Sequence, residues 1–229
     1  AGSGAGGGSA GAPRRRAEHA ARGPAPAHAR TGAEVAAEVD RLALSSRPPV
    51  VRLEDAPGLV AKLRSQASPD VLSGARGLWA LVQAGEKACV AGQDGVLDAL
   101  AHVLHSAAAL PRFFALATLG QLAFFSAPLA RRVAAHARVR SGVVAVLRGG
   151  KGIEGEAAKV VGNTAANCAE SAAAWVAEEG LLAALQHCSA ASQHISTCVA
   201  GALFALSRAP GGAAAVAAAG LGDSVLAAV

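Results

Sequence analysis

The stretch Gly95-Val-Leu-Asp-Ala-Leu100 returns along the chain as Gly142-Val-Val-Ala-Val-Leu147 and as Gly180-Leu-Leu-Ala-Ala-Leu185. An earlier copy is Gly58-Leu-Val-Ala-Lys-Leu63, and a weaker later copy is Gly220-Leu-Gly-Asp-Ser-Val-Leu226. Successive glycines of this marker are 37, 47, 38 and 40 residues apart. Such a regular period predicts a repeat protein, in which each copy is one supersecondary unit that buries its apolar face against its neighbours.

A second marker repeats in step with the first. Its copies are Trp79-Ala-Leu-Val-Gln83, Ala117-Thr-Leu-Gly-Gln121, Asn163-Thr-Ala-Ala-Asn167 and Gly201-Ala-Leu-Phe-Ala205. The steps between them are 38, 46 and 38 residues, so both markers have their longer step in the same unit. The two markers therefore share one period of about forty residues, which is the length of a HEAT or armadillo repeat.

These residues resemble the armadillo family, whose repeat has a short first helix, a glycine, a second helix and a longer third helix. The resemblance covers residues 50–229. It implies an all-α, right-handed α-solenoid (an armadillo-like superhelix) of about four to five repeats. Full repeats are expected over residues 85–126, 127–171 and 172–209. Residues 210–229 supply a first and a second helix without a third, so we expect the last repeat to be incomplete.

The first copy of the repeat can be divided into helices. Residues 58–66 are expected to form a second helix, and a third helix is expected to run to Gln83 with Ser68 as its N-cap and Pro69 in its first turn. The glycine before each second helix is expected to permit a tight turn and a close approach between helices. Apolar residues make up 52% of the chain and charged residues 16%. Because alanine supplies much of the apolar content and is the best helix former, the sequence predicts closely packed helices.

The beginning of the chain has a different composition. Residues 1–31 are rich in Gly, Ala and Arg without apolar periodicity, so we expect a disordered arm followed by a repeat domain over residues 32–229. A helical apolar stripe begins near Thr31 and reaches Leu44. The arm holds five arginines and one glutamate, so it carries +4 of the chain's net charge of +5. The nearly neutral remainder lacks the basic stripe that nucleic-acid binding requires.

Two further features bear on the compartment. Residues 113–130 contain no charge, but they include Gly120 and Pro128, which favours a buried helix followed by a turn over a membrane span. The four cysteines are not closely paired, which favours free thiols in a reducing compartment. We expect a cytoplasmic protein, with an organelle or a cilium as alternatives.

The resemblance also suggests a partner site. In peptide-binding armadillo proteins an Asn near the end of the third helix hydrogen-bonds an extended peptide, and a Trp one turn earlier forms slots for its side chains. The corresponding Asn positions here hold Gln83, Gln121, Asn167 and Ala205, and the Trp positions hold Trp79, Ala117, Asn163 and Gly201. Because one Asn and one Trp match, in different repeats, an importin-like nuclear-signal pocket is not expected. The candidate partner residues are Trp79, Gln83, Gln121, Asn163 and Asn167; the alternative is that these amides end helices and Trp79 belongs to the core.

A second candidate surface lies in the longest unit. Residues 127–140, expected to form one long first helix, contain Arg131, Arg132, Arg138 and Arg140. Our hypothesis is that this basic segment binds an acidic partner. The alternative is a solvated helix face.

Patterns typical of metal sites and catalysis are weak. The group formed by His187, Cys188, His194 and Cys198 has a spacing that matches no common zinc finger. His102 and His105 are three residues apart on an expected second helix, as a pair of metal ligands can be, but we interpret them as part of a solvated helix face. Residues 148–152 resemble a phosphate loop but lack its first Gly and the Ser or Thr after the Lys. We therefore expect a non-enzymatic protein without cofactor or metal.

The function predicted from these observations is a protein–protein interaction scaffold or adaptor that binds a partner protein or an extended peptide in the concave groove. No nucleic-acid, membrane or small-molecule partner is expected. One alternative is a structural subunit of a large ciliary or organellar assembly. Another is an armadillo-like nucleotide exchange factor of a chaperone.

Overall fold

The computed structural model describes residue 37 and residues 50–105, 108–149 and 151–222. The expected arm over residues 1–31 lies outside them, as does the helical stripe from Thr31 to Leu44 apart from residue 37. Within the described ranges the ordered elements are helices, which confirms the all-α prediction for them. The elements are η1 (Leu53–Asp55), α2 (Ala56–Leu63), α3 (Ser68–Gln83), α4 (Lys87–Ala91), α5 (Val96–Leu104), α6 (Ala109–Ala123), α7 (Ala127–Ala135), α8 (Ala137–Gly149), α9 (Glu154–Asn167), α10 (Ala169–Val176), α11 (Leu181–Cys188), α12 (Gln193–Ser207) and α13 (Gly212–Ala218).

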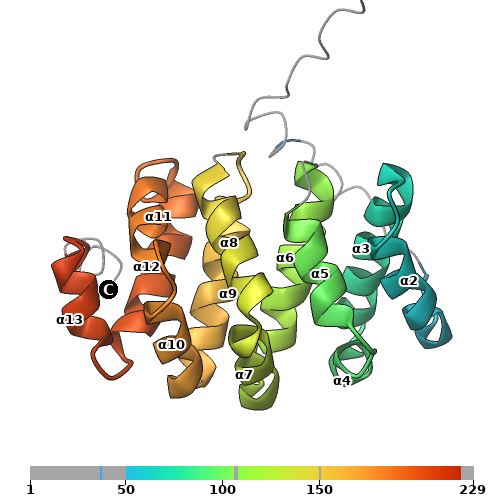
Figure 1. Ribbon diagram of the computed structural model, residues 1–229, viewed down its shortest axis with the longest axis horizontal. Helices are drawn as coiled ribbons and strands as arrows, with labels where there is room; N and C mark the ends of the chain where they lie inside the picture. Colours follow the sequence, from blue (N-terminus) through green and yellow to red (C-terminus); the bar gives the residue numbers. More distant parts are fainter. Residues whose placement is uncertain (1–36, 38–49, 106–107, 150, 223–229) are drawn as a thin grey trace, which may run out of the picture. The chain divides into compact units, whose positions relative to one another are not determined.

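The helices pack in two parallel series. The long helices α3, α6, α9 and α12 contact one another in chain order, and α2, α5, α8 and α11 form a second series in the same way. Each long helix also contacts the member of the second series that precedes it in the chain. Figure 1 shows these pairs side by side, with the short helices α4, α7 and α10 at one end of them.

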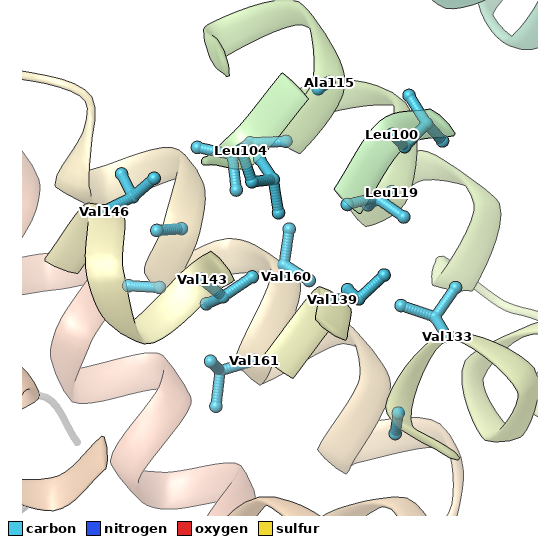
Figure 2. Packing of buried hydrophobic residues seen from close by; sticks show 14 of the residues in the cluster. Leu100, Leu104, Ala115, Leu119, Val133, Val139, Val143, Val146, Val160 and Val161 are labelled. Carbon is cyan, nitrogen blue, oxygen red and sulfur yellow. The ribbon is translucent and has the colours of Figure 1, made fainter. Parts of the chain in front are cut away.

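Small apolar side chains fill the space between the series. One continuous cluster of buried Leu, Val and Ala residues extends from α2 to the segment after α13. Figure 2 shows its middle, where the side chains of Leu104 of α5, Val143 of α8 and Val160 of α9 point toward one another. Burying each such Leu or Val side chain contributes about 1.5–3 kcal/mol, whereas Ala contributes less but lets helices approach closely. The core therefore depends on many close helix contacts.

The glycines of the repeat marker have two different roles. Gly95 and Gly180 directly precede α5 and α11 with φ of 65° and 74°, so the predicted tight turn is present there. Gly142 instead lies inside α8, where an added Cβ would be 2.8 Å from Cβ of Leu104. The prediction of a turn at Gly142 was wrong, and its physical role is the close approach between α8 and α5. Gly58 lies inside α2 and has neither role.

A contact between neighbouring members of the second series recurs. Arg64 follows α2, and its Nη2 donates a hydrogen bond of 3.2 Å to the carbonyl oxygen of Gly95 at the start of α5. In the same way, the guanidinium of Arg148 near the end of α8 fills the space beside Gly180, at the start of α11. Two equivalent Arg–Gly contacts indicate that both neighbouring pairs pack in the same register.

The long step in the period also has a structural cause. Residues 127–140 do not form one long helix, because His136 has extended backbone (φ −81°, ψ 101°) and separates α7 from α8. His136 Nδ1 accepts a weak hydrogen bond of 3.4 Å from the backbone N–H of Val139, as an N-cap would. The extra residues lengthen α8 to 13 residues, against 9 in α5 and 8 in α11.

Smaller differences concern helix ends. Helix α2 ends at Leu63 and not at Gln66. Ser68 is the first residue of α3, and the N-cap position with extended backbone is Ala67. The uncharged stretch over residues 113–130 is divided between α6 and α7. Across the described ranges, no helix has both the length and the apolar character needed to cross a bilayer.

Candidate functional site

The long helices keep one side incompletely buried. On each of them the half-buried and exposed residues recur at helical spacing, so they share a face of that helix. We call this set the third-helix face. It comprises Leu72, Arg76, Trp79 and Gln83 of α3; Leu110, Phe113 and Gln121 of α6; Glu156, Lys159, Asn163 and Asn167 of α9; and Thr197, Gly201 and Phe204 of α12.

Aromatic rings occupy the α3 and α6 part of this face. Trp79 is half-buried, and its ring lies 5.4 Å from that of Phe114 across the helix boundary. Phe114 is buried and meets the half-buried ring of Phe113 edge-on at 5.3 Å. Trp79 therefore contributes both to the core and to the surface.

The two asparagines connect α9 to α6. Asn163 Nδ2 donates a hydrogen bond of 3.1 Å to the carbonyl oxygen of Gly120. Asn167 Nδ2 donates to the carbonyl oxygens of Ala123, at 3.3 Å, and of Asn163, at 2.7 Å. Gly120 and Ala123 lie in the last turn of α6, where their carbonyl oxygens also accept backbone hydrogen bonds from Phe124 and Ser126. The amide N–H groups of both asparagines are thus engaged within the protein, and their oxygens are the groups that can accept a hydrogen bond from a ligand.

The other positions of the predicted groove differ in exposure. Gln83 is exposed at the end of α3, and Gln121 is half-buried near the end of α6. Gly201 is exposed, and no atom lies within 4 Å of the position that a Cβ would take there. Phe204, one turn further along α12, is also exposed. Ala205 is buried. The structure therefore places all five predicted groove residues on the third-helix face. Gln83 is the most exposed of the four amide residues among them.

The four arginines lie on other elements and are largely paired within the chain. Arg131 and Arg132 are on α7, and Arg138 and Arg140 are on α8. Arg131 lies 3.6 Å from Glu170, and Arg138 lies 4.0 Å from Asp98. Arg132 is exposed.

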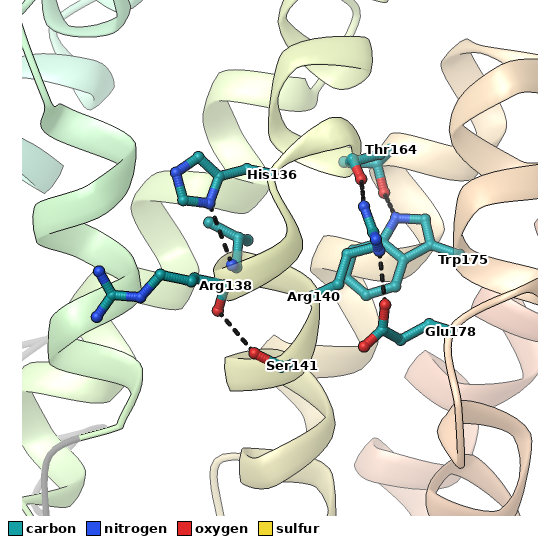
Figure 3. Close-up of polar contacts among 9 residues, drawn as sticks. His136, Arg138, Arg140, Ser141, Thr164, Trp175 and Glu178 are labelled. Carbon is teal, nitrogen blue, oxygen red and sulfur yellow. Dashed lines mark hydrogen bonds and ion pairs between the residues drawn. The ribbon is translucent and has the colours of Figure 1, made fainter.

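Arg140 is the most enclosed of the four. Its Nε donates to Glu178 at 2.7 Å, and its Nη1 donates to the carbonyl oxygen of Ala134 at 2.6 Å. Its side chain is 19% exposed and that of Glu178 is 18% exposed. Figure 3 shows Arg138 and Arg140 pointing in opposite directions from α8, with Arg140 directed toward Trp175 and Glu178. The arginines therefore do not form one patch, and Arg140 connects helices.

A buried polar contact that the sequence reasoning missed lies next to Arg140. Trp175 is fully buried, and its Nε1 donates a hydrogen bond of 2.6 Å to Oγ1 of Thr164. Thr164 Oγ1 donates in turn to the carbonyl oxygen of Val160 in the same helix. This contact joins α10 to α9 (Figure 3).

The cysteines have different surroundings. The Sγ of Cys188 lies 2.9 Å from the carbonyl oxygen of Leu147, and burial raises the pKa of this thiol to about 11, with Glu154 adding to the effect. Cys198 Sγ lies 3.8 Å from Nε2 of His194. In the part of the chain that the structure describes, no three His, Cys, Asp or Glu side chains converge as a metal site would require.

The thiol of Cys168 lies between charged groups. Its Sγ donates to Glu170 at 2.7 Å, and this hydrogen bond, together with Arg131, lowers the pKa of the Glu170 carboxyl group. The three groups connect α7 to the start of α10. Together they form a local contact between α7 and α10.

Exposed aromatic residues were also missed. Phe124 and Phe125 follow α6 and are 39% and 84% exposed, and Phe204 of α12 is 46% exposed. The adjacent phenylalanines just before Ser126 and Pro128 were the signal that could have indicated them, because a turn places side chains at the surface. Comparisons with protein-family models, with curated proteins and with solved structures found no match to this chain.

Proposed function

We propose that the described helices belong to a right-handed, armadillo-like α-solenoid whose third-helix face binds an extended segment of a partner protein. The two series of helices support the architecture, because each member packs on the equivalent member of the next triplet. The repeated contacts of Arg64 with Gly95 and of Arg148 with Gly180 support a common register between the units. An open stack of units differs from a closed globule in having a continuous row of equivalent surface positions.

The observation that carries the binding proposal is this row of incompletely buried rings and amides on four successive helices. Trp79, Phe113 and Phe204 offer apolar contact area, and Gln83 offers an amide that both donates and accepts. Adjacent packed helices are about 8–10 Å apart, so the row from α3 to α12 extends over roughly 24–30 Å. An extended segment of about ten residues spans that distance. Its backbone polar groups would meet amides, and its side chains would meet the rings.

A peptide library tests the proposal. The full chain is immobilised and probed with a phage-displayed library of random peptides about 16 residues long, which exceeds the length of the row. Enriched peptides are synthesised with a fluorescent label, and their Kd is measured by anisotropy. We expect the double variant Gln83→Ala/Phe204→Ser to weaken binding at least about tenfold, since it removes contacts at both ends of the row.

The matched control changes exposed residues of the second series. His102→Ala/His187→Ala alters α5 and α11 and should leave the Kd unchanged, because these side chains are not on the third-helix face. Enriched peptides that bind the Gln83/Phe204 variant as tightly as the original chain would contradict the proposal. So would a selection that enriches no peptide.

A further inference from the structure

A thiol and an imidazole lie next to each other at the beginning of α12. His194 is exposed, and Cys198, four residues later on the same helix, is half-buried. Residues four apart are neighbours on a helix surface, and here Nε2 of His194 lies 3.8 Å from Sγ of Cys198. The thiol of Cys188 is separate from them, because it is buried against the carbonyl oxygen of Leu147. His194 and Cys198 therefore form a pair of soft ligand atoms.

The distance between the two ligand atoms fits a metal ion that binds both. Metal–sulfur and metal–nitrogen bonds are about 2.3 and 2.0 Å long. They place sulfur and nitrogen about 3.5 Å apart around a tetrahedral ion and about 4.3 Å apart on opposite sides of a linear one. The separation of 3.8 Å between Nε2 and Sγ lies between these values. The two atoms are thus already as far apart as the ligands of one ion.

The pair packs against the first turn of α9, where Gly155 has no side chain to cover it. A Cβ at Gly155 would lie 3.4 Å from Nε2 of His194 and 3.6 Å from Sγ of Cys198. The charges of α9 that act on the thiol belong to Lys159 and Glu156, and these two side chains form an ion pair with each other. Because Lys159 binds the nearby carboxylate, sulfur and nitrogen are the ligands that the location offers.

These ligands favour one kind of metal ion. Zinc and calcium sites are built from three or more protein ligands, and no such group converges in the described ranges. Cu(I) is a soft ion that thiolate and imidazole ligands select, and two of them are enough to hold it. Burial raises the pKa of the Cys198 thiol, so this group keeps its proton until an ion displaces it. The reducing compartment expected from the unpaired cysteines is also one in which copper is monovalent.

We infer that Cys198 and His194 form a Cu(I) site at the boundary between α9 and α12, with Sγ of the thiolate and Nε2 of the imidazole as its protein ligands. Cu(I) replaces the proton of the thiol, the proton passes to solvent, and no electron is transferred. The affinity for Cu(I) should therefore rise with pH. This inference goes beyond the proposed function and does not depend on peptide binding by the third-helix face.

Competition for Cu(I) tests the inference. The full chain, reduced and kept free of oxygen, is titrated against the coloured complex of Cu(I) with bicinchoninate, and the loss of colour gives the Kd. We expect His194→Ala and Cys198→Ser each to weaken binding at least about tenfold, since each removes one of the two protein ligands. X-ray absorption at the copper edge of the loaded chain should show one sulfur and at least one nitrogen ligand.

The controls are side chains of the same types elsewhere on the surface. Cys89→Ser removes an exposed thiol of α4, and His187→Ala removes an exposed imidazole of α11, so both should leave the Kd unchanged. If His194→Ala held Cu(I) as tightly as the original chain, the ion would be binding thiols alone and the inference would be overturned. The absence of transfer from bicinchoninate, loss of binding in Cys89→Ser or a Kd that does not change with pH would also overturn it. Circular dichroism of each variant establishes that it remains helical.

Discussion

At the scale of single residues, the backbone of Phe125 is strained, because its φ of 55° lies in the left-handed region. A residue with a Cβ in the left-handed region costs roughly 1–2 kcal/mol, and glycine there costs only its greater freedom in the unfolded chain. We therefore expect Phe125→Gly to raise the free energy of unfolding by up to about 1 kcal/mol in urea titrations. Phe125→Ala is the matched control, because it removes the ring but keeps the strained φ. Equal stabilities for the Gly and Ala variants would show that the turn is not strained.

Gly142 lies at a close contact between helices α8 and α5. A Cβ there would be 2.8 Å from Cβ of Leu104, an atom next to the backbone of α5 that cannot rotate away. Gly142→Ala should lower the free energy of unfolding by about 1–3 kcal/mol, as overpacking does. Gly58→Ala, inside α2 with no atom within 4 Å of the added Cβ, should instead raise it by about 0.5–1 kcal/mol. Thermal and urea unfolding of the pair check both signs, and a stabilising Gly142→Ala would disprove the close approach.

Cys188 makes stability depend on pH in the alkaline range. Its thiol has a pKa of about 11 in the folded protein against an ordinary value of 9.0. Between these values the folded chain keeps a proton that the unfolded chain has lost, so stability falls as the pH rises through the window. Urea unfolding under reducing conditions, at pH values below and across the window, should show a smaller decline for Cys188→Ala. Identical pH profiles for the two proteins would contradict the raised pKa.

At the scale of elements, the sequence indicated the helices well and their junctions poorly. Helix α3 was expected to follow an N-cap at Ser68 and to end at Gln83; it begins one residue earlier, at Ser68, and ends at Gln83. Pro69 is favourable in the first turn, and Gly85 follows the C-cap residue Ala84. The break at His136 could not be read in the same way, because neither Gly nor Pro marks it. His136 accepts a local hydrogen bond from the backbone N–H of Val139, and its Nε2 lies 3.3 Å from Asp98 of α5. The contact with Asp98 joins two elements, so the sequence of this segment alone does not show it.

The ion pairs of α7 and α8 give a test of how helices are connected. Arg140 and Glu178 are mostly buried and directly bonded, whereas Arg131 and Glu170 are 61% and 71% exposed. Arg140→Leu leaves the Glu178 carboxylate enclosed without its partner, so we expect the free energy of unfolding to fall by about 2–3 kcal/mol. Arg131→Leu should change it by less than about 1 kcal/mol, because exposed pairs contribute little. Chemical denaturation compares the two, and similar losses would mean that burial does not distinguish them.

At the scale of the whole molecule, the repeat period predicted the order of helices more reliably than it predicted the binding residues. The triplets α4–α6 and α7–α9 fall within the ranges 85–126 and 127–171 derived from the glycine and amide markers, whereas α10 begins at Ala169, before the expected start of the third range at residue 172. The roles of Asn163 and Asn167 could not be read in this way. Their amides bond to the neighbouring helix, and the sequence of one helix does not show which carbonyl groups of another lie opposite.

Because the helices pack in series, the local stability of each helix should depend on its place in the series. Hydrogen exchange of backbone amides measures this local stability. Helix α9 contacts both α6 and α12, whereas α13 contacts the preceding helices α10 and α12. In a repeat protein each unit is stabilised chiefly by its nearest neighbours, so a helix with neighbours on both sides opens less often. We expect backbone amides of α13 to exchange at least about tenfold faster than those of α9 under native conditions. Helix α12, with α9 on one side and α13 on the other, should be intermediate. Uniform exchange across α6, α9, α12 and α13 would indicate one cooperative globule, and the proposal of a stacked solenoid would then fail.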